Sequence, residues 1–132
     1  MENKKTLEEV KKIFEGDRFA TENGAVIEEV GDHSATCSLK ITDSHRNAMG
    51  AVMGGTYFML ADFAFAVASN YEGTATVSLS SNIQYLNVAK GTTLIAEVSC
   101  LKAGKRTCVM ETMITDELGT QVAKVTGTGC RL

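Results

Sequence analysis

The sequence contains no proline, no tryptophan and only two histidines among its 132 residues. Without proline, the turns must be built by Gly, Asn and Asp. Four cysteines are present, but none forms a C-x-x-C pair, which together with so few histidines argues against a zinc site. All four fall in strand-like segments, so we expect reduced thiols packed as small hydrophobic side chains rather than a disulfide framework: Cys37, Cys100, Cys108 and Cys130.

The sequence also lacks a positive charge balance and a long hydrophobic run. The net charge of -3 gives no overall basic field for nucleic acid. The first ten residues, M-E-N-K-K-T-L-E-E-V, are too polar for a signal peptide, and the longest apolar run is shorter than the about 20 residues that span a bilayer. We expect a cytoplasmic protein without nucleic-acid or membrane partners. Its 44% hydrophobic and 22% charged residues are typical of one globular domain covering residues 1–132.

One carboxylate stands out within an apolar segment. Residues 56–68 read T-Y-F-M-L-A-D-F-A-F-A-V-A, in which Asp62 is the only charge. A segment that is apolar on nearly every side predicts a helix buried by its surroundings, where an unpaired aspartate is rare and costly. A polar, glycine-rich loop from His45 to Gly55 leads directly into this helix. The loop, its backbone donors and the isolated acid together indicate an active site.

The rest of the chain predicts one short helix and several strands. Thr6 and Glu9 form a capping box, and apolar residues at helical spacing follow, so we expect an amphipathic helix over residues 6–15. Gly73 is expected to end the long helix. Alternating apolar residues and turn signals predict strands over residues 25–30, 33–42, 74–87, 92–101, 107–115 and 120–131.

This order of elements predicts an α+β fold. Strands joined by short turns, such as Ala89-Lys90-Gly91, should be antiparallel neighbours. An antiparallel sheet wrapped around a long central apolar helix explains why that helix has no polar face. Because one sheet cannot enclose the helix completely, we expect the chain to dimerise.

The residues at the loop and helix suggest chemistry, each with a structural alternative. Asp62 is a candidate general base or nucleophile, since an apolar site raises the pKa of a carboxylate, but it could instead hold a neighbouring loop. Gly54 and Gly55 open the helix, where free N–H groups favour a developing negative charge. They could equally form a tight turn that needs glycine. No G-x-S-x-G sequence is present, which disfavours a serine hydrolase.

Several motifs in this sequence resemble those of hotdog-fold acyl-CoA thioesterases of the phenylacetate-degradation (PaaI-like) type. The resemblance covers essentially the whole chain after residue 20, and the spacing from Asn47 through Gly54 to Asp62 is its most specific part. The matching segments are His45-x-Asn47-x-x-Gly50-x-x-x-Gly54-Gly55, Leu60-Ala61-Asp62, Val77-Ser78-Leu79-x-x-Asn82-Ile83-x-Tyr85-Leu86, Lys102-x-Gly104-Lys105-Arg106 and Gly119-x-x-Val122-Ala123. One position departs from the family, which commonly has His where this sequence has Met53.

The resemblance implies a hotdog fold and the hydrolysis of an acyl-CoA thioester without a metal. Coenzyme A belongs to the substrate, so no separate cofactor is expected. The family also implies a homo-oligomer, a dimer with sheets side by side that often pairs into tetramers, and active sites at the dimer interface. Aryl, hydroxyaryl, short and medium acyl chains all remain possible substrates.

The resemblance also assigns expected roles to individual residues. Asn47 matches the position of a second polar contact to the carbonyl, beside the Gly54 N–H as oxyanion donor, and Ser78 matches the residue that holds the attacking water. His45 is a further catalytic candidate, although a loop-stabilising hydrogen bond is the alternative. Gly55 and Asn82 are expected to contact coenzyme A.

Three cations flank the Gly104 turn between two predicted strands. Lys102, Lys105 and Arg106 could bind the phosphates of coenzyme A, Arg through two parallel hydrogen bonds. A solvated hairpin tip is the alternative.

Two other functions are considered. Met53 motivates a non-catalytic acyl-CoA-binding module, which would bind esters tightly without turnover. A hotdog dehydratase or hydratase ranks last, because it would need a catalytic His and no comparable His follows the loop.

Overall fold

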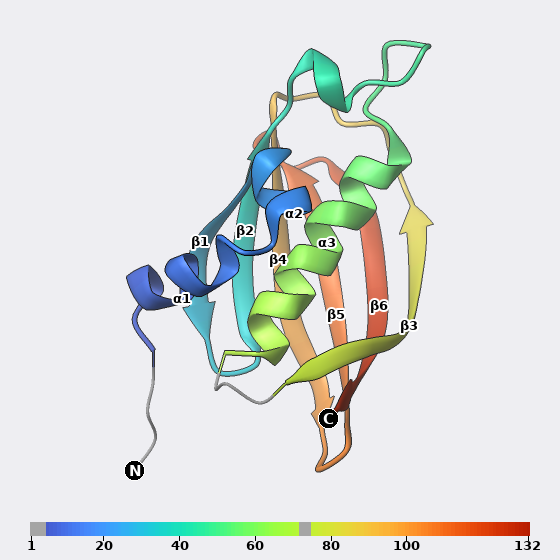
Figure 1. Cartoon of the computed structure of the whole chain (residues 1–132). Helices are drawn as coiled ribbons and strands as arrows, with labels where there is room; N and C mark the ends of the chain where they lie inside the picture. Colours follow the sequence, from blue (N-terminus) through green and yellow to red (C-terminus); the bar gives the residue numbers. More distant parts are fainter. Residues whose placement is uncertain (1–4, 72–74) are drawn as a thin grey trace.

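The computed structural model describes residues 5–71 and 75–132 (Figure 1). The helices are α1 (Leu7–Phe14), α2 (Arg18–Glu22) and α3 (Gly54–Ser69), with a 3-10 turn η1 (Asp43–His45). The strands are β1 (Ala25–Gly31), β2 (Ser34–Lys40), β3 (Thr76–Tyr85), β4 (Thr93–Ala103), β5 (Thr107–Asp116) and β6 (Gln121–Arg131). Within these residues, no helix is long and apolar enough to cross a membrane.

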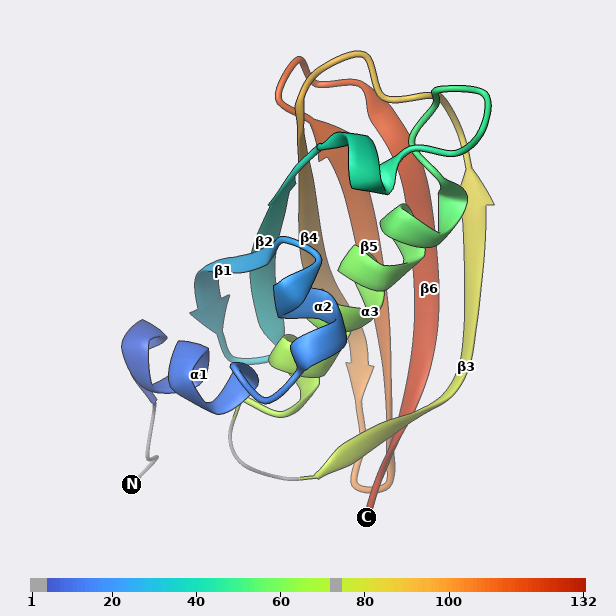
Figure 2. The same cartoon turned by 45° about the horizontal axis from the view of Figure 1, so that its top comes forward.

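The strands form one antiparallel sheet that curves around α3. Their order is β1-β2-β4-β5-β6-β3, and every pair of neighbours is antiparallel. Figures 1 and 2 show α3 lying along the inner face of the sheet, with α1 and α2 beside it over β1 and β2. The predicted α+β hotdog fold, an antiparallel sheet around a central helix, is thereby confirmed.

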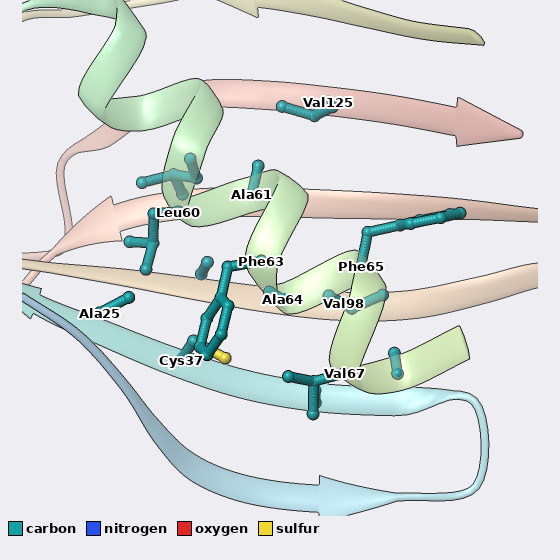
Figure 3. Close-up of a cluster of buried hydrophobic side chains, with 14 of the residues drawn as sticks. Ala25, Cys37, Leu60, Ala61, Phe63, Ala64, Phe65, Val67, Val98 and Val125 are labelled. Carbon is teal, nitrogen blue, oxygen red and sulfur yellow. The ribbon is translucent and has the colours of Figure 1, made fainter. Parts of the chain in front are cut away.

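The core lies between α3 and the inner face of the sheet (Figure 3). Leu60, Ala64 and Val67 of α3 are fully buried there. The ring of Phe65 lies against β6 at two glycines, where an added Cβ would come within 3.5 Å of the ring at Gly127 and within 2.8 Å at Gly129. The alternating glycines of β6 therefore provide the space that Phe65 fills.

The N-terminal region contains the predicted capping box and one helix that the sequence did not reveal. The Thr6 hydroxyl accepts a hydrogen bond from the Glu9 N–H (3.2 Å), and the Glu9 carboxylate accepts one from the Thr6 N–H (3.1 Å). Phe14 of α1 packs edge-on against Phe63 of α3, with ring centroids 6.0 Å apart. Helix α2 follows directly, and its five residues are too few to produce a periodic apolar pattern.

The prediction that β3 and β4 are neighbours is wrong. Both edges of β4 are occupied, by β2 and β5, and β3 pairs with β6 instead. The segment between β3 and β4 crosses the end of the sheet, where the Asp116 carboxylate accepts hydrogen bonds from the N–H groups of Lys90 (2.8 Å) and Gly91 (2.9 Å). The residues of a turn show that the chain changes direction, but they do not show which strand will be the neighbour. β3 pairs with β6 because β6 has an edge that β5 does not occupy.

The remaining predicted boundaries agree with the structure to within a few residues. β3 begins and ends two residues inside the predicted range of 74–87, and α3 ends at Ser69. The predicted helix stop at Gly73 lies outside the described residues. Each cysteine lies on a strand as predicted, with Cys37 and Cys108 buried and the other two half-buried.

Candidate active site

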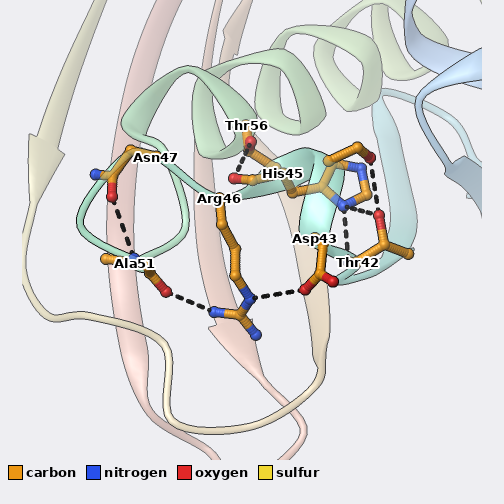
Figure 4. A network of polar contacts seen from close by, with 9 residues as sticks. Thr42, Asp43, His45, Arg46, Asn47, Ala51 and Thr56 are labelled. Carbon is orange, nitrogen blue, oxygen red and sulfur yellow. Dashed lines mark hydrogen bonds and ion pairs between the residues drawn. The ribbon is translucent and has the colours of Figure 1, made fainter.

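The loop before α3 is organised by His45, whose imidazole is buried (Figure 4). Its Nδ1 accepts a hydrogen bond from the Thr42 N–H (2.9 Å), so Nε2 carries the proton and donates to the Asn23 carbonyl (2.5 Å) at the end of α2. Its own carbonyl accepts from the Met53 N–H (2.9 Å) and the Thr56 hydroxyl (3.3 Å). With both ring nitrogens hydrogen-bonded, this geometry fits the loop-stabilising alternative for His45.

Asn47 closes the next part of the loop while leaving one group free. Its Oδ1 accepts hydrogen bonds from the N–H groups of Met49 (3.0 Å) and Ala51 (3.1 Å), and its own N–H donates to the Ala51 carbonyl (2.8 Å). The Nδ2 amide group has no acceptor among residues 5–71 and 75–132, and the residue is exposed. Asn47 therefore presents a fixed donor to solvent.

Gly54 and Gly55 are the first two residues of α3. Met53 precedes them as the N-cap and makes no side-chain capping bond, and neither glycine N–H has an acceptor within the described parts of the chain. Gly54 and Asn47 line the same hollow, which has a volume of ≈ 430 Å³. The Gly54 N–H and the Asn47 side-chain amide, two donors without an acceptor in the described residues, therefore border one hollow at the positive end of the helix dipole.

Tyr85 of β3 lies over this helix start. An added Cβ at Gly54 would come within 3.0 to 3.1 Å of the Tyr85 ring, and Tyr85 is tilted against Tyr57 with centroids 6.4 Å apart. Both tyrosines line the hollow of Gly54 and Asn47. The absence of a Cβ at Gly54 therefore permits the close approach of Tyr85.

Asp62 is exposed on α3 within a single chain, which agrees with the expectation that one sheet cannot enclose this helix completely. It lies on the exposed face of α3 with Gly55, while the opposite face packs on the sheet. It lines a second hollow with α2. Partial desolvation raises the pKa of the Asp62 carboxyl, and the nearby charge of Asp17 raises this pKa further.

The predicted catalytic residues are not all brought together within one chain. Gly54 and Asp62 are eight residues apart on a continuous helix, a separation of about 12 Å along the axis at 1.5 Å per residue. Ser78 pairs opposite Gly129, whose open side faces Phe65, so Ser78 shares the face of the sheet that α3 covers. Both Ser78 and Asn82 are exposed on β3, and Asn82 accepts a hydrogen bond from Gln84.

The three predicted phosphate-binding cations lie far from the glycine loop. Lys102, Lys105 and Arg106 are exposed around the β4–β5 hairpin, at the opposite end of the sheet from residues 46–54 in both views. Arg131 at the end of β6 joins them, since its Nε donates to the Gly104 carbonyl (3.3 Å).

Three residues beside the candidate groups escaped the sequence reasoning. Tyr85 was part of a matched segment, but nothing local showed that it would lie over Gly54. Asp17 and Phe19 reach the hollow of Asp62 through α2, a helix too short to be predicted. The sequence signal for α2 is weak: Asp17, a residue type that often precedes a helix, is followed by Arg-Phe-Ala.

Comparison with known sequences gives a consistent family. The sequence model of the thioesterase superfamily matches residues 49–123, which are more than half of the chain. The acyl-coenzyme A thioesterase PaaI of Escherichia coli K12 is 31% identical over 121 residues, which cover 91% of this chain and 86% of that protein.

Solved structures agree with that assignment. The E. coli PaaI protein of the phenylacetic acid degradation operon superposes with a TM-score of 0.88 and 28% identity, covering 96% of each chain. A protein of Streptococcus pneumoniae TIGR4, described as a hypothetical thioesterase and solved with coenzyme A, gives a TM-score of 0.83 and 28% identity, covering 90% of this chain and 96% of the other.

Proposed function

Because the chain belongs to the thioesterase superfamily and is a hotdog thioesterase of the PaaI-like type, we propose that it hydrolyses acyl-CoA thioesters at a site formed by two copies of the chain. One observation carries this proposal. The chain holds both halves of such a site, donors at the start of α3 and an acid two turns along it, about 12 Å apart. At this distance, the donors and the acid of one chain cannot act on the same carbonyl. A complete site therefore needs the donors of one chain and the acid of a second chain.

The free edge of β3 supports the pairing of two chains. Among the described residues, β3 pairs with β6 alone, and apolar residues remain exposed along it, with Val77 46%, Leu79 60% and Tyr85 55% exposed. An unpaired edge of this kind is a template for another strand. Two β3 strands related by a two-fold axis would extend the sheet across the dimer and set the two α3 helices side by side in opposite directions. The acid of each helix can then approach the glycine end of the other.

The same two-fold arrangement favours the proposed binding of coenzyme A. Reversal of the partner brings its β4–β5 hairpin toward the end of this chain that carries Gly54. Lys102, Lys105 and Arg106 of one chain could then contact the phosphates of a substrate whose carbonyl lies at the other chain's loop. The complex of the S. pneumoniae protein with coenzyme A supports this class of ligand.

The proposed reaction follows from the charges at the two halves. The Gly54 N–H and the Asn47 amide donate to the thioester oxygen and stabilise the oxyanion as it forms. Asp62 takes the proton of the attacking water, which Ser78 holds, and its raised pKa makes it a stronger base. The tetrahedral intermediate then expels the thiolate of coenzyme A, which accepts a proton. Direct attack by the Asp62 carboxylate, through an anhydride, is the alternative route.

The test is thiol release from a panel of acyl-CoAs by the wild type and by Asp62→Asn. We expect release by the wild type and a loss of at least about 10²-fold in the variant. Asp32→Asn, which removes a surface carboxylate from the β1–β2 turn, is the matched control. An active Asp62→Asn protein would refute this mechanism. Single turnover in ¹⁸O-labelled water separates the two routes, since label enters the enzyme only if Asp62 is the nucleophile.

Binding without turnover would favour the acyl-CoA-binding module instead. Met53 motivates this second function, because its side chain is 56% exposed at the helix start where the family commonly has His. In that case Met53→His is the variant to examine for restored thiol release.

A further inference from the structure

A groove runs along the outer side of α3, between this helix and α2. It consists of two adjoining hollows of ≈ 300 and ≈ 220 Å³. Asp62 and Ala66 line the first, Met53 and Gly55 line the second, and Phe19 and Met59 line both. The groove therefore begins at the proposed base, and two flexible apolar side chains divide it.

Phe19 is unusual for an aromatic residue because its side chain is 76% exposed. It nevertheless sits on a fixed backbone. The Phe19 carbonyl accepts a hydrogen bond from the Asn23 side chain (2.6 Å), and the Asn23 carbonyl accepts from the buried His45 ring. An Arg18–Glu22 ion pair joins the two ends of α2 on its outer surface. The ring can thus change rotamer while its Cα stays in place.

We propose, on the basis of the thioesterase function above, that the acyl chain lies in this groove and that Phe19 with Met59 forms a gate setting the accepted chain length. Short acyl groups occupy the hollow beside Asp62 without disturbing the gate. Longer chains must pass between Phe19 and Met59 to reach the hollow at Met53, about 10 to 13 Å along α3 from Asp62. The occupant is an unbranched apolar chain, because the two side chains that line both hollows, Phe19 and Met59, are apolar and methionine adapts to varied shapes; Asp17 and Arg18 also line the first hollow.

The groove adjoins the proposed reaction centre on its α3 side, and its α2 wall lies away from the β3 edge assigned to the other subunit. α2 lies beside β1 and β2, whereas the free edge of β3 lies on the other side of α3 (Figure 2). An acyl chain directed from Asp62 toward α2 thus leads away from the β3 edge. Phe19, which belongs to α2, therefore lies on the side of α3 away from the proposed β3 contact.

The experiment measures binding of S-butyl-CoA and S-decyl-CoA, two thioethers that cannot be hydrolysed, by calorimetry. We expect Phe19→Ala to tighten decyl binding relative to butyl by about tenfold or more, and Phe19→Trp to change the ratio in the opposite direction. Leu118→Ala is the matched control, because Leu118 is 68% exposed in the β5–β6 turn, outside the groove. The ratio for this control should equal that of the wild type.

The outcomes separate this proposal from the enzyme function. A changed binding ratio supports the gate even if no acyl-CoA is hydrolysed. An unchanged ratio in both Phe19 variants overturns the gate even if hydrolysis is rapid, and so does a failure of either thioether to bind. A changed oligomeric state of Phe19→Ala with an unchanged ratio would assign Phe19 to a subunit contact instead.

Discussion

Replacement of Gly54 by alanine tests the oxyanion site most directly. The backbone at Gly54 does not have a positive φ, so alanine is allowed there, and its helix propensity is higher than that of glycine by up to about 1 kcal/mol. The added Cβ would lie 3.0 to 3.1 Å from the Tyr85 ring, about 0.5 Å inside an ordinary carbon contact. Tyr85 is 55% exposed at the free sheet edge and can shift by that amount.

We therefore expect Gly54→Ala to fold normally but to hydrolyse thioesters poorly. The melting temperature should change by no more than about 4 °C. Alanine keeps the N–H group, but its methyl group would stand beside the place where the thioester oxygen is proposed to bind. If the methyl group blocks this donor completely, the loss should approach that of a deleted donor, about 10²–10³ in kcat or about 2.7–4 kcal/mol. The measurements are kcat and KM from thiol release, with melting temperature from circular dichroism.

Two comparison variants decide the interpretation. At Gly55, the one contact that an added Cβ would make within the described residues is with the Met53 methyl group, at 3.7 Å, so Gly55→Ala makes the same chemical change without a clash. If Gly55→Ala loses as much activity as Gly54→Ala or more, Gly54 is not the principal donor. If Gly54→Ala with Tyr85→Ala recovers full activity, the displaced tyrosine caused the loss and the reasoning about the oxyanion is refuted.

Three further changes test the electrostatics and the proposed dimer. Asp17→Asn removes a negative charge that helps raise the pKa of Asp62, so the acidic limb of the pH profile of kcat/KM should move to lower pH. If this limb stays where it is in the wild type, Asp62 is not the titrating base. Burial alone would raise the pKa of Asp116, but backbone hydrogen bonds outweigh it and hold this pKa below the ordinary value of 3.8. The Asp116 carboxylate then stabilises the folded protein fully above about pH 4, and this stabilisation is lost as pH falls toward the lower pKa of the folded state. The melting temperature of Asp116→Asn should therefore lie well below that of the wild type at pH 7, and the difference should be smaller near pH 3. Leu79→Lys places a charge on the free β3 edge, and sedimentation should show weakened association with reduced activity at low protein concentration; an intact, fully active oligomer would exclude this edge as the interface.

Local sequence patterns determined most of the secondary structure. The Thr6–Glu9 capping box, the long apolar helix and the alternating strands were all predictable, because each depends on residues within one or two turns or within one strand. The matched motifs also predicted the hotdog fold. α2 escaped prediction because five residues carry no periodic signal; in the structure it packs on β1 and α3, and the His45 ring donates a hydrogen bond to the Asn23 carbonyl at its end.

The arrangement of the candidate site could be predicted only in part. The sequence identified Asp62, Gly54 and Asn47, since an isolated acid and a glycine-rich loop are visible in the chain itself. It assigned His45 as a further candidate, but whether a histidine is free or occupied depends on which carbonyl lies against its ring, here one from 22 residues away.

The sequence by itself predicted all the described strands, the helices α1 and α3, and the candidate catalytic residues, because these patterns depend on neighbours along the chain. Only the tertiary structure decided that β3 pairs with β6 and that Asp62 faces outward beside α2. The same is true of the β4–β5 hairpin, which carries the phosphate-binding candidates and lies at the opposite end of the sheet from the start of α3. These features depend on which edges and faces remain free once the core has formed, and contacts between distant segments settle that choice.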